Sequence, residues 1–514
     1  MDKIILANKL WVPSNLVNNQ MLQDWTYEWT EARYELKENE YGEVEEDQYG
    51  NPVKELKTEF KQIKTYRERV LPDGSTYVEF PRGNLKKLQR LLTRSHEDRR
   101  PLSCIGYKLK LSQKVLTDHR WPDQKRCAEE YLKKGYGIIK GDTGSGKTVI
   151  GIAVACKLGL TALIISTMTD GIKQWIAAFQ EHTNILEIEK ENNIELIGAY
   201  KSTKKRKLFP ITVATVQAFE SPAGIEFIKQ HRNDFSFLLV DEVHDFGAPV
   251  AALTIQSINA FAILGLTATV EREDNKHYIV FDIIGPVVAV GTAKQMPPTV
   301  YFIGTGVTAP GWIYNKNYPP HYQWTVVMNC LAKSEERYDT IKKFLYADID
   351  SGRTVLIMGE RREIIKNVYK RLIQDGYTAE YVDGEVKAEA RAKIYKEIRS
   401  GRCKVLCAGK VLKAMVDLPN IDCLHFVTPL SSKPRTTQIY GRARRWLENK
   451  RNPVIRDYVD GAGQQGQLTG AYKNRLAMCK SNNWDVKLIN IENTQEEGVG
   501  KWRRRHEQLY LNER

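Results

Sequence analysis

The chain has 514 residues, and its 77 lysines and arginines outnumber its 63 aspartates and glutamates, which gives a formal net charge of +14. That length allows roughly three or four domains. The sequence has no apolar run of about 18 residues, and charge interrupts the N-terminus too early for a signal peptide, so we expect a cytoplasmic protein without a membrane partner. Its 8 cysteines include no C-x-x-C pair, which predicts a reduced chain without structural zinc. The basic balance favours a polyanionic partner.

Residues 1–115 have the pattern of a small, separate α+β domain. An acidic stretch at 38–51 predicts a solvated loop or hairpin tip. Alternating residues at 66–70 and 76–80 flank the turn sequence Pro72-Asp73-Gly74, which predicts a β-hairpin. A helix is expected to start after Pro81-Arg82-Gly83-Asn84. Its predicted apolar face consists of Leu85, Leu88, Leu91 and Leu92.

Residues 116–295 alternate apolar runs with helical stretches, which predicts a doubly wound α/β domain. Its buried parallel strands are expected at 136–139, 162–166, 211–214, 236–240 and 262–266.

The same alternation returns over residues 334–495 and predicts a second α/β domain. Its strands are expected at 354–358, 378–382, 404–407, 422–427 and 454–459, and its helices at 334–347, 361–375 and 387–400.

Residues 296–333 are rich in proline and aromatic side chains, which predicts a linker with an ordered aromatic loop at 311–324. The aromatic side chains either stack on splayed bases or anchor the loop in a core. The basic tail at 496–514 is either a solvated terminus or a phosphate contact.

A phosphate-binding sequence occupies residues 141–148. Gly141-Asp142-Thr143-Gly144-Ser145-Gly146-Lys147-Thr148 fits G-x-x-x-x-G-K-[ST], between an apolar run and an alanine-rich helical stretch. Glycines allow successive backbone N–H groups to point at phosphate oxygens, and the helix N-terminus adds its positive end. We expect Lys147 to reach the β- and γ-phosphates of ATP and Thr148 to hold Mg²⁺.

An acidic sequence, Asp241-Glu242-Val243-His244, follows the apolar run at 236–240. A carboxylate at the end of a strand, downstream of a phosphate loop, is placed to meet Mg²⁺. We expect Asp241 to hold the metal, Glu242 to polarise the attacking water and His244 to couple the site to moving parts.

These two motifs and further segments between residue 120 and about residue 460 resemble the superfamily 2 helicases and translocases. The resemblance implies that Gln124 reads the adenine. Residues matching the coupling motifs of that family are Thr267, Thr269 and Gln438. Residues matching its nucleic-acid contacts are Thr167, Thr215, Gln217, Gly359, Gly409 and Lys410.

The sequence from Gln438 to Arg445 resembles motif VI of that family, Q-x-x-G-R-x-x-R. The resemblance implies that Arg445 is an arginine finger and Arg442 a second contact to the γ-phosphate. One helical turn separates the two, so both are expected to face one cleft. Motif V departs from the pattern, with Gly409 in place of threonine and Met415 in place of glycine, although Asp417 is still implied to contact ribose.

The implied fold is two RecA-like, doubly wound parallel-sheet lobes in tandem behind the small α+β domain, with ATP and Mg²⁺ as cofactors. The run from Thr267 to Asp274 and the N-terminal module resemble the phage UvsW-like and XPB-like helicases. That likeness implies a monomeric DNA helicase or translocase, moving 3′→5′ in the host cytoplasm if it is encoded by a phage. Its partners are expected to be branched or partly single-stranded DNA and phage or host recombination proteins, in recombination, replication or repair.

Three other functions stay open at this point. The chain is alternatively an RNA helicase, the motor subunit of a restriction or repair complex, or a nucleic-acid clamp with a vestigial ATP site. Residues 1–115 either bind duplex DNA or only stabilise the first lobe.

Overall fold

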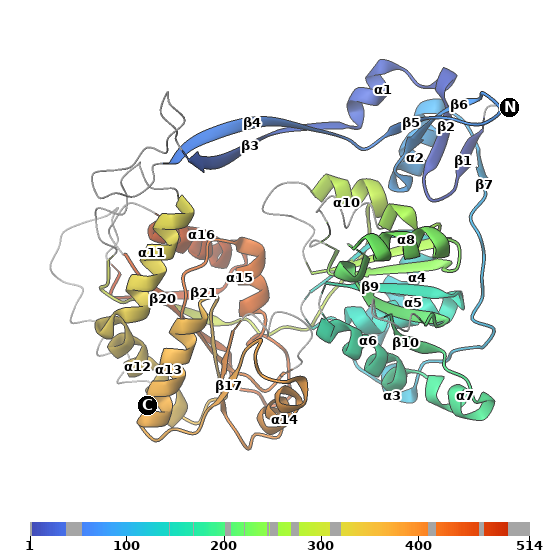
Figure 1. Cartoon of the computed structure of the whole chain (residues 1–514). Helices are drawn as coiled ribbons and strands as arrows, with labels where there is room; N and C mark the ends of the chain where they lie inside the picture. The colour runs from blue at the N-terminus through green and yellow to red at the C-terminus, as the bar shows by residue number, and fades with distance from the viewer. Residues whose placement is uncertain are drawn as a thin grey trace. The chain divides into compact units, whose positions relative to one another are not determined.

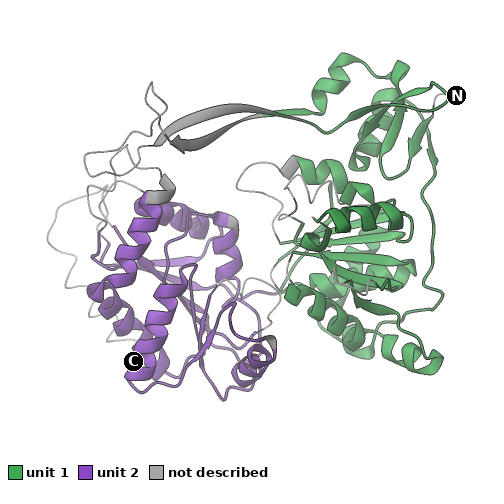
Figure 2. Ribbon diagram, in the orientation of Figure 1, with its two compact units in different colours: residues 1–31, 60–293 green, residues 32–59, 294–514 purple. Residues whose placement is uncertain are grey.

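The computed structural model describes residues 3–36, 54–142, 144–167, 169–200, 207–219, 221–243, 246, 255–268, 277–308, 320–409, 418–461 and 467–491. It forms two compact units. One comprises residues 1–31 and 60–293, and the other comprises residues 32–59 and 294–514 (Figure 2).

The first unit begins with a 5-stranded sheet in the order β5-β6-β2-β1-β7. Its strands are β1 (Ile4–Leu6), β2 (Leu10–Pro13), β5 (Arg67–Val70), β6 (Thr76–Phe80) and β7 (His96–Asp98). The antiparallel pairing of β5 with β6 confirms the predicted hairpin. Helices α1 (Asn19–Asp24) and α2 (Leu85–Leu92) contribute side chains to its core.

The predicted apolar face of α2 is wrong at one position. Leu85 and Leu88 are buried and Leu92 packs against the core, but the side chain of Leu91 is 53% exposed. The helix has only 8 residues, and Leu85, Leu88 and Leu92 already cover the side that faces the core.

Hydrogen bonds join the N-terminal part of the chain to the α/β lobe that follows. The buried carboxylate of Asp282 accepts hydrogen bonds from Tyr27 Oη (2.8 Å), Thr65 Oγ1 (3.3 Å) and Asn84 Nδ2 (2.8 Å). The buried guanidinium of Arg82 donates to the carbonyl oxygens of Ala260 and Phe261, which precede strand β13 (Ala262–Thr267) of the lobe. These contacts explain why the predicted separate domain at 1–115 does not match the compact units.

Residues 32–59 group with the second unit instead. Residues 32–36 and 54–59 of this segment belong to two long strands, β3 (Thr26–Leu36) and β4 (Lys54–Lys64), which pair as a 2-stranded sheet. The acidic stretch predicted at 38–51 lies outside the described residues.

The first lobe is built on a 7-stranded sheet in the order β10-β11-β9-β12-β13-β8-β14, with every neighbouring pair parallel. Helices surround this sheet (Figure 1). Its strands are β8 (Tyr136–Gly141), β9 (Ala162–Ser166), β10 (Ile197–Ala199), β11 (Ile211–Thr215), β12 (Phe237–Asp241), β13 (Ala262–Thr267) and β14 (Val287–Gly291). Its helices include α3 (Gln113–Leu116), α4 (Trp121–Leu132), α5 (Lys147–Leu158), α6 (Thr169–His182), α7 (Ile185–Asn192), α8 (Pro222–His231) and α10 (His277–Ile284). The predicted doubly wound domain is confirmed.

The second lobe repeats this architecture with a 7-stranded parallel sheet in the order β17-β18-β16-β19-β20-β15-β21. Its strands are β15 (Thr299–Gly304), β16 (Val355–Met358), β17 (Glu380–Val382), β18 (Val405–Ala408), β19 (Cys423–Phe426), β20 (Val454–Val459) and β21 (Asp485–Ile489). Its helices are α11 (Pro320–Lys333), α12 (Glu335–Asp350), α13 (Arg362–Gln374), α14 (Ala388–Arg399), α15 (Lys433–Tyr440) and α16 (Gln467–Ser481). Two apolar core clusters use alternate residues of these strands.

The prediction of a linker at 296–333 is wrong. Strand β15 lies inside the second sheet, between β20 and β21, and α11 contributes Val327 and Leu331 to the core. Trp324 packs against the same core from α11, so this tryptophan anchors a helix. Residues 311–319, including Trp312, lie outside the described part of the chain. A strand this short, set among prolines, gives too little periodic signal to be found from sequence.

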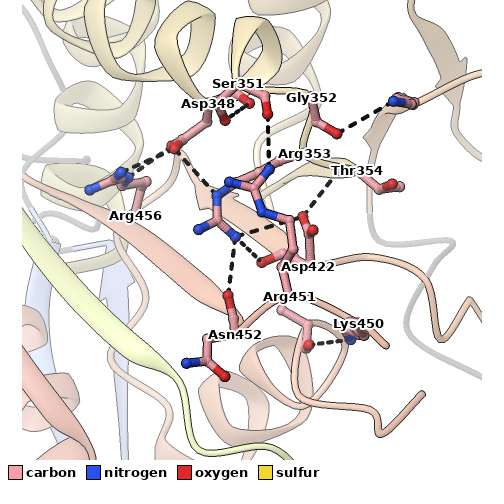
Figure 3. Close-up of polar contacts among 12 residues, drawn as sticks. Asp348, Ser351, Gly352, Arg353, Thr354, Asp422, Lys450, Arg451, Asn452 and Arg456 are labelled. Atoms are coloured by element: carbon pink, nitrogen blue, oxygen red, sulfur yellow. Dashed lines mark hydrogen bonds and ion pairs between the residues drawn. The ribbon is translucent and has the colours of Figure 1, made fainter. Parts of the chain in front are cut away.

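A buried polar network holds the elements of the second lobe together (Figure 3). Arg456 on β20 makes a bidentate pair with Asp348 on α12, at 2.8 and 3.0 Å. Cys423 and His425 on β19 approach the same carboxylate, in a grouping of metal-ligand types. The guanidinium already neutralises Asp348, so we interpret the cluster as a structural ion pair.

Candidate active site

The carboxyl ends of the first lobe's strands bring the predicted motifs to one edge of the sheet. In the sheet register, Thr215 lies opposite Ser166, and Asp241 lies opposite Leu266, the residue before Thr267. Thr267 in turn pairs with Lys140, next to the phosphate loop. Ligands of open parallel sheets bind at this edge, so the arrangement positions the motifs around one site.

The phosphate loop has the backbone that its glycines allow. Gly144 and Gly146 have φ values of 93° and 79°, in the left-handed region that favours glycine. A Cβ atom on Gly146 would lie 2.2 Å from Gln124 Nε2, so a larger residue would displace this amide as well as strain the backbone. Helix α5 begins at Lys147, directly after this loop. Its N-terminus therefore presents free backbone N–H groups to an anion.

Two buried polar atoms beside the loop fit a nucleotide. Gln124 is 2% exposed, and its Nε2 donates to Ser145 O at 3.0 Å. Within the described ranges, Gln124 Oε1 and Ser145 Oγ are buried without a hydrogen-bond partner. An unsatisfied buried polar atom costs about 1–3 kcal/mol, which a polar ligand at this loop would recover. The residues present therefore match ATP.

Lys147, Asp241 and Glu242 meet next to the loop. Lys147 Nζ donates to Gly141 O at 3.2 Å and lies 3.9 Å from Glu242 Oε1. Asp241 is 4% exposed, and its Oδ1 accepts from the backbone N–H of Glu242 at 3.0 Å. Glu242 has a φ of 51°, a strained value for a residue with a side chain, and such strain clusters at functional sites.

A tryptophan that the sequence did not assign to this site holds Asp241. Trp175 on α6 is fully buried, and its Nε1 donates to Asp241 Oδ2 at 3.0 Å. Burial, and then the charge of Glu242, raises the pKa of Asp241 to about 7, although the hydrogen bond from Trp175 and the charge of Lys147 oppose the rise. In the sequence, Gln174-Trp175 with Ser166-Thr167 resembles motif Ia of the superfamily 2 helicases, and this resemblance assigns Trp175 no role at the ATP site.

The oxygen atoms of Asp241 and Thr148 form a donor set that suits Mg²⁺. A magnesium ion bound there would neutralise charge on the phosphate oxygens. Asp241, whose pKa is raised, would bind the ion in its deprotonated form.

The structure places some of the remaining predicted residues of the first lobe. Gln217 Nε2 donates to Thr167 O at 3.4 Å, so two predicted nucleic-acid contacts lie together at the strand ends. Thr267 is fully buried at the end of β13. Thr143, His244 and Thr269 lie outside the described residues.

In the second lobe, Gly359 and Gly409 follow β16 and β18 at the carboxyl edge. A Cβ on Gly359 would lie 1.9 Å from Thr428 Oγ1, so packing accounts for this glycine. Among the described residues, a Cβ on Gly409 would meet only Asp383 Cβ, at an ordinary 3.9 Å, so the first carbon of a side chain is not excluded there. Lys410, Met415 and Asp417 lie outside the described residues.

Motif VI departs from the expected helix. Helix α15 ends at Tyr440, and Gly441 caps it. Arg442 follows in a tight turn, in which its backbone N–H donates to Ile439 O at 3.1 Å. Arg445 forms an isolated antiparallel β-bridge with Gln295. The prediction that a helical turn aligns Arg442 with Arg445 is therefore wrong, because the helix ends first.

A buried ion pair fixes the end of this helix. The hydroxyl of Tyr440, which is fully buried, donates to Asp457 on β20. Arg475 on α16 makes a bidentate pair with the same carboxylate, at 2.6 and 2.8 Å, and donates to Leu430 O at 3.0 Å. The start of motif VI is thereby tied to the sheet.

Comparisons with known families match both lobes. Residues 113–272 match the family described as the res subunit of type III restriction enzymes, and residues 336–447 match the helicase conserved C-terminal domain. Among the helices of the described ranges, none has the length and apolar character to cross a membrane.

Individual relatives agree with these families. The "Probable helicase D10" of Escherichia phage T5 is 26% identical over 68% of this chain and 72% of its own. The "DNA 3'-5' helicase XPB" of Kineococcus radiotolerans is 26% identical over 81% of this chain and 74% of its own. The solved structure of the ATP-dependent type ISP restriction-modification enzyme LlaBIII bound to DNA is also similar, with a TM-score of 0.51 and 13% sequence identity. The match covers 74% of this chain and 32% of the LlaBIII chain, and at this identity it supports only the fold.

Proposed function

Because the chain belongs to the superfamily 2 helicases, ATP-hydrolysing enzymes with two RecA-like lobes, we propose that it is a DNA motor that moves 3′→5′ and remodels branched DNA. The observation that supports ATP use most directly is the meeting of Lys147, Asp241 and Glu242 beside the glycine-lined loop. The formal net charge of +14 and the names of its DNA helicase relatives favour DNA as the partner.

Each residue of the site has a role in this proposal. Gln124 and the loop from Gly141 to Thr148 bind the nucleotide, and Lys147 moves from Glu242 to the phosphates. Glu242 is then released to orient the attacking water as its general base. Arg445 and Arg442 contact the γ-phosphate and stabilise the charge of the transition state, an effect worth about 10³–10⁵ in rate for an arginine finger.

Nucleic acid is held by its backbone in this proposal. The predicted contacts Thr167, Thr215 and Gln217 lie at strand ends of the first lobe and carry short polar side chains. Side chains of this kind bond to phosphate and sugar oxygens, which carry no sequence information. The motor should therefore tolerate most sequences and select its substrate by shape.

The test is ATP turnover and strand separation measured on forks, Holliday-type junctions, linear duplex, single-stranded DNA and structured RNA. We expect junctions and forks to give the strongest stimulation and to be processed only when ATP is present. Stronger stimulation by RNA would overturn the DNA assignment in favour of an RNA helicase. An absence of stimulation by any nucleic acid would favour the clamp.

The match of residues 113–272 to restriction-enzyme motor subunits favours one second candidate. In that case the chain supplies translocation to a partner that carries the nuclease. Purification of the tagged chain from its native host tests this candidate, because a stoichiometric nuclease partner is expected for a motor subunit and is not expected for an autonomous helicase.

A further inference from the structure

A lysine outside every motif holds the backbone of the turn that carries the two arginines. Lys450 Nζ donates to Ala443 O and to Arg445 O, both at 2.7 Å. Between them, Arg444 O accepts from the backbone N–H of Met296 at 2.9 Å. Three successive carbonyl groups of motif VI are thus each bonded to a donor from another segment.

These bonds matter because of where the turn lies. It follows α15, which ends at Tyr440, so the carbonyl groups of Ala443 and Arg445 lie outside the helix. Such groups need donors from elsewhere in the chain when they are not exposed to water. Lys450 therefore satisfies carbonyl groups that would otherwise leave the turn free to take other conformations.

The loop that carries Lys450 is itself anchored (Figure 3). Arg451 Nη1 donates to Ser351 O at 2.9 Å, and Arg353 Nη1 donates to Asn452 O at 3.1 Å. Arg353 in turn lies between two buried carboxylates, 3.8 Å from that of Asp348 and 3.9 Å from that of Asp422. The buried network thus extends to the backbone next to Lys450, so the ammonium group is attached to a fixed support.

We propose that Lys450 is a positioning residue for ATP hydrolysis, which holds the turn from Ala443 to Arg445 so that the motif VI arginines are presented to the γ-phosphate. The proposal rests on the function proposed above for Arg442 and Arg445. Lys450 itself contacts neither nucleotide nor nucleic acid in this proposal.

The experiment compares Lys450→Met, Lys450→Arg and Lys473→Met with the wild type in the full chain. Lys473 is an exposed lysine of the same lobe and serves as the matched control. At saturating ATP and junction DNA, we expect Lys450→Met to lower kcat roughly tenfold, as for the loss of two charge-assisted bonds. The affinity for a fluorescent ATP analogue should change by less than about twofold, because the phosphate loop of the other lobe binds it. Lys450→Arg should keep most of the turnover, and Lys473→Met all of it.

A pH profile gives a second readout that a merely structural role would not change. Burial lowers the pKa of Lys450 to about 8, opposed by the carboxylate of Asp422 and assisted by the charge of Arg445. The wild-type kcat should therefore fall as the pH rises above about 8, where the ammonium group loses its proton and donates more weakly. Lys450→Arg keeps its charge, so its alkaline decline should move to higher pH.

The outcomes separate this proposal from the one on which it rests. If Arg445→Ala abolishes turnover but Lys450→Met hydrolyses ATP like the wild type, the positioning role is overturned and the proposed function stands. If Arg445→Ala itself turns over normally, the assignment of motif VI fails first. The positioning role would also be contradicted if both Lys450 variants lost ATP affinity and thermal stability. The same holds if kcat of the wild type and of Lys450→Arg declined at the same alkaline pH.

Discussion

At the scale of single residues, the indole of Trp175 is the least expected part of the ATP site. It donates to the Asp241 carboxylate at 3.0 Å from α6, where the sequence predicted no contact with the ATP site. Hydrogen bonds to charged groups contribute about 1.5–3 kcal/mol when both partners are buried. Trp175 therefore orients the proposed metal ligand and opposes the rise of its pKa.

The substitution Trp175→Phe should reveal this role, because it keeps the aromatic ring and removes the N–H group. We expect kcat for ATP hydrolysis to fall about tenfold or more, with a higher Mg²⁺ concentration needed for half-maximal activity. Steady-state ATPase assays over a Mg²⁺ titration measure both effects. Trp11→Phe, in the N-terminal sheet, is the control and should behave like the wild type; equal activity of the two variants would contradict the role.

The raised pKa of Asp241 predicts a pH-dependent stability. Burial raises this pKa from 3.8 to about 7, so between these pH values the folded chain keeps a proton that the unfolded chain has lost. The contribution of Asp241 to stability is therefore most favourable at low pH and declines as the pH rises through about 7. Asp241→Asn cannot ionise, so it should raise the melting temperature of the nucleotide-free protein more at pH 8 than at pH 5. Asp485→Asn, at an exposed carboxyl, should show no such difference, and a shift for Asp241→Asn that is equal at both pH values would contradict the assignment.

At the scale of elements, the sequence predicted the strands that form the centres of the two sheets, because parallel strands buried on both faces are nearly continuous apolar runs. It missed β15, whose six residues follow a pair of prolines, and it extended motif VI as a helix beyond Tyr440. The periodic pattern carries no information on the bridge between Arg445 and Gln295, which joins segments 150 residues apart in the sequence. Likewise, the bond from Trp175 to Asp241 and the bonds from Lys450 to motif VI depend on tertiary packing, which spacing along the chain does not encode.

The attachment of the N-terminal sheet to the first lobe predicts the effect of one glycine. A Cβ on Gly83 would lie 2.3 Å from Phe281 O and 2.6 Å from Asp282 O, both backbone atoms of α10. Gly83→Ala should therefore destabilise the first unit by about 1–3 kcal/mol, measured as a lower melting temperature. Gly470→Ala is the matched control, since its Cβ meets nothing within 4 Å on an exposed helical turn. An alanine at this control position should stabilise slightly, by about 0.5–1 kcal/mol. Equal melting temperatures for the two variants would show that the interface is looser than these distances indicate.

At the scale of the whole molecule, the net charge of +14 predicts how DNA is bound. A protein held by phosphate contacts releases counterions from DNA, so its affinity falls steeply with salt. For about 6–10 such contacts we expect the affinity for a junction to drop roughly 10³–10⁵-fold between 50 and 200 mM salt, in fluorescence anisotropy titrations. Glu242→Gln should show the same slope, because it leaves the binding surface intact. A flat salt profile would mean that apolar or base contacts dominate.

The proposed ATP hydrolysis depends on Glu242 acting on water while the glycine loop holds ATP. The most direct test is ATP turnover by Glu242→Gln at saturating ATP and junction DNA, with binding of both ligands measured on the same preparation. We predict that the variant binds ATP and DNA as tightly as the wild type and that its turnover falls by a factor of about 10² or more, because the neutral amide cannot accept a proton. Turnover equal to that of the wild type would show that this carboxylate is not the catalytic base of the motor.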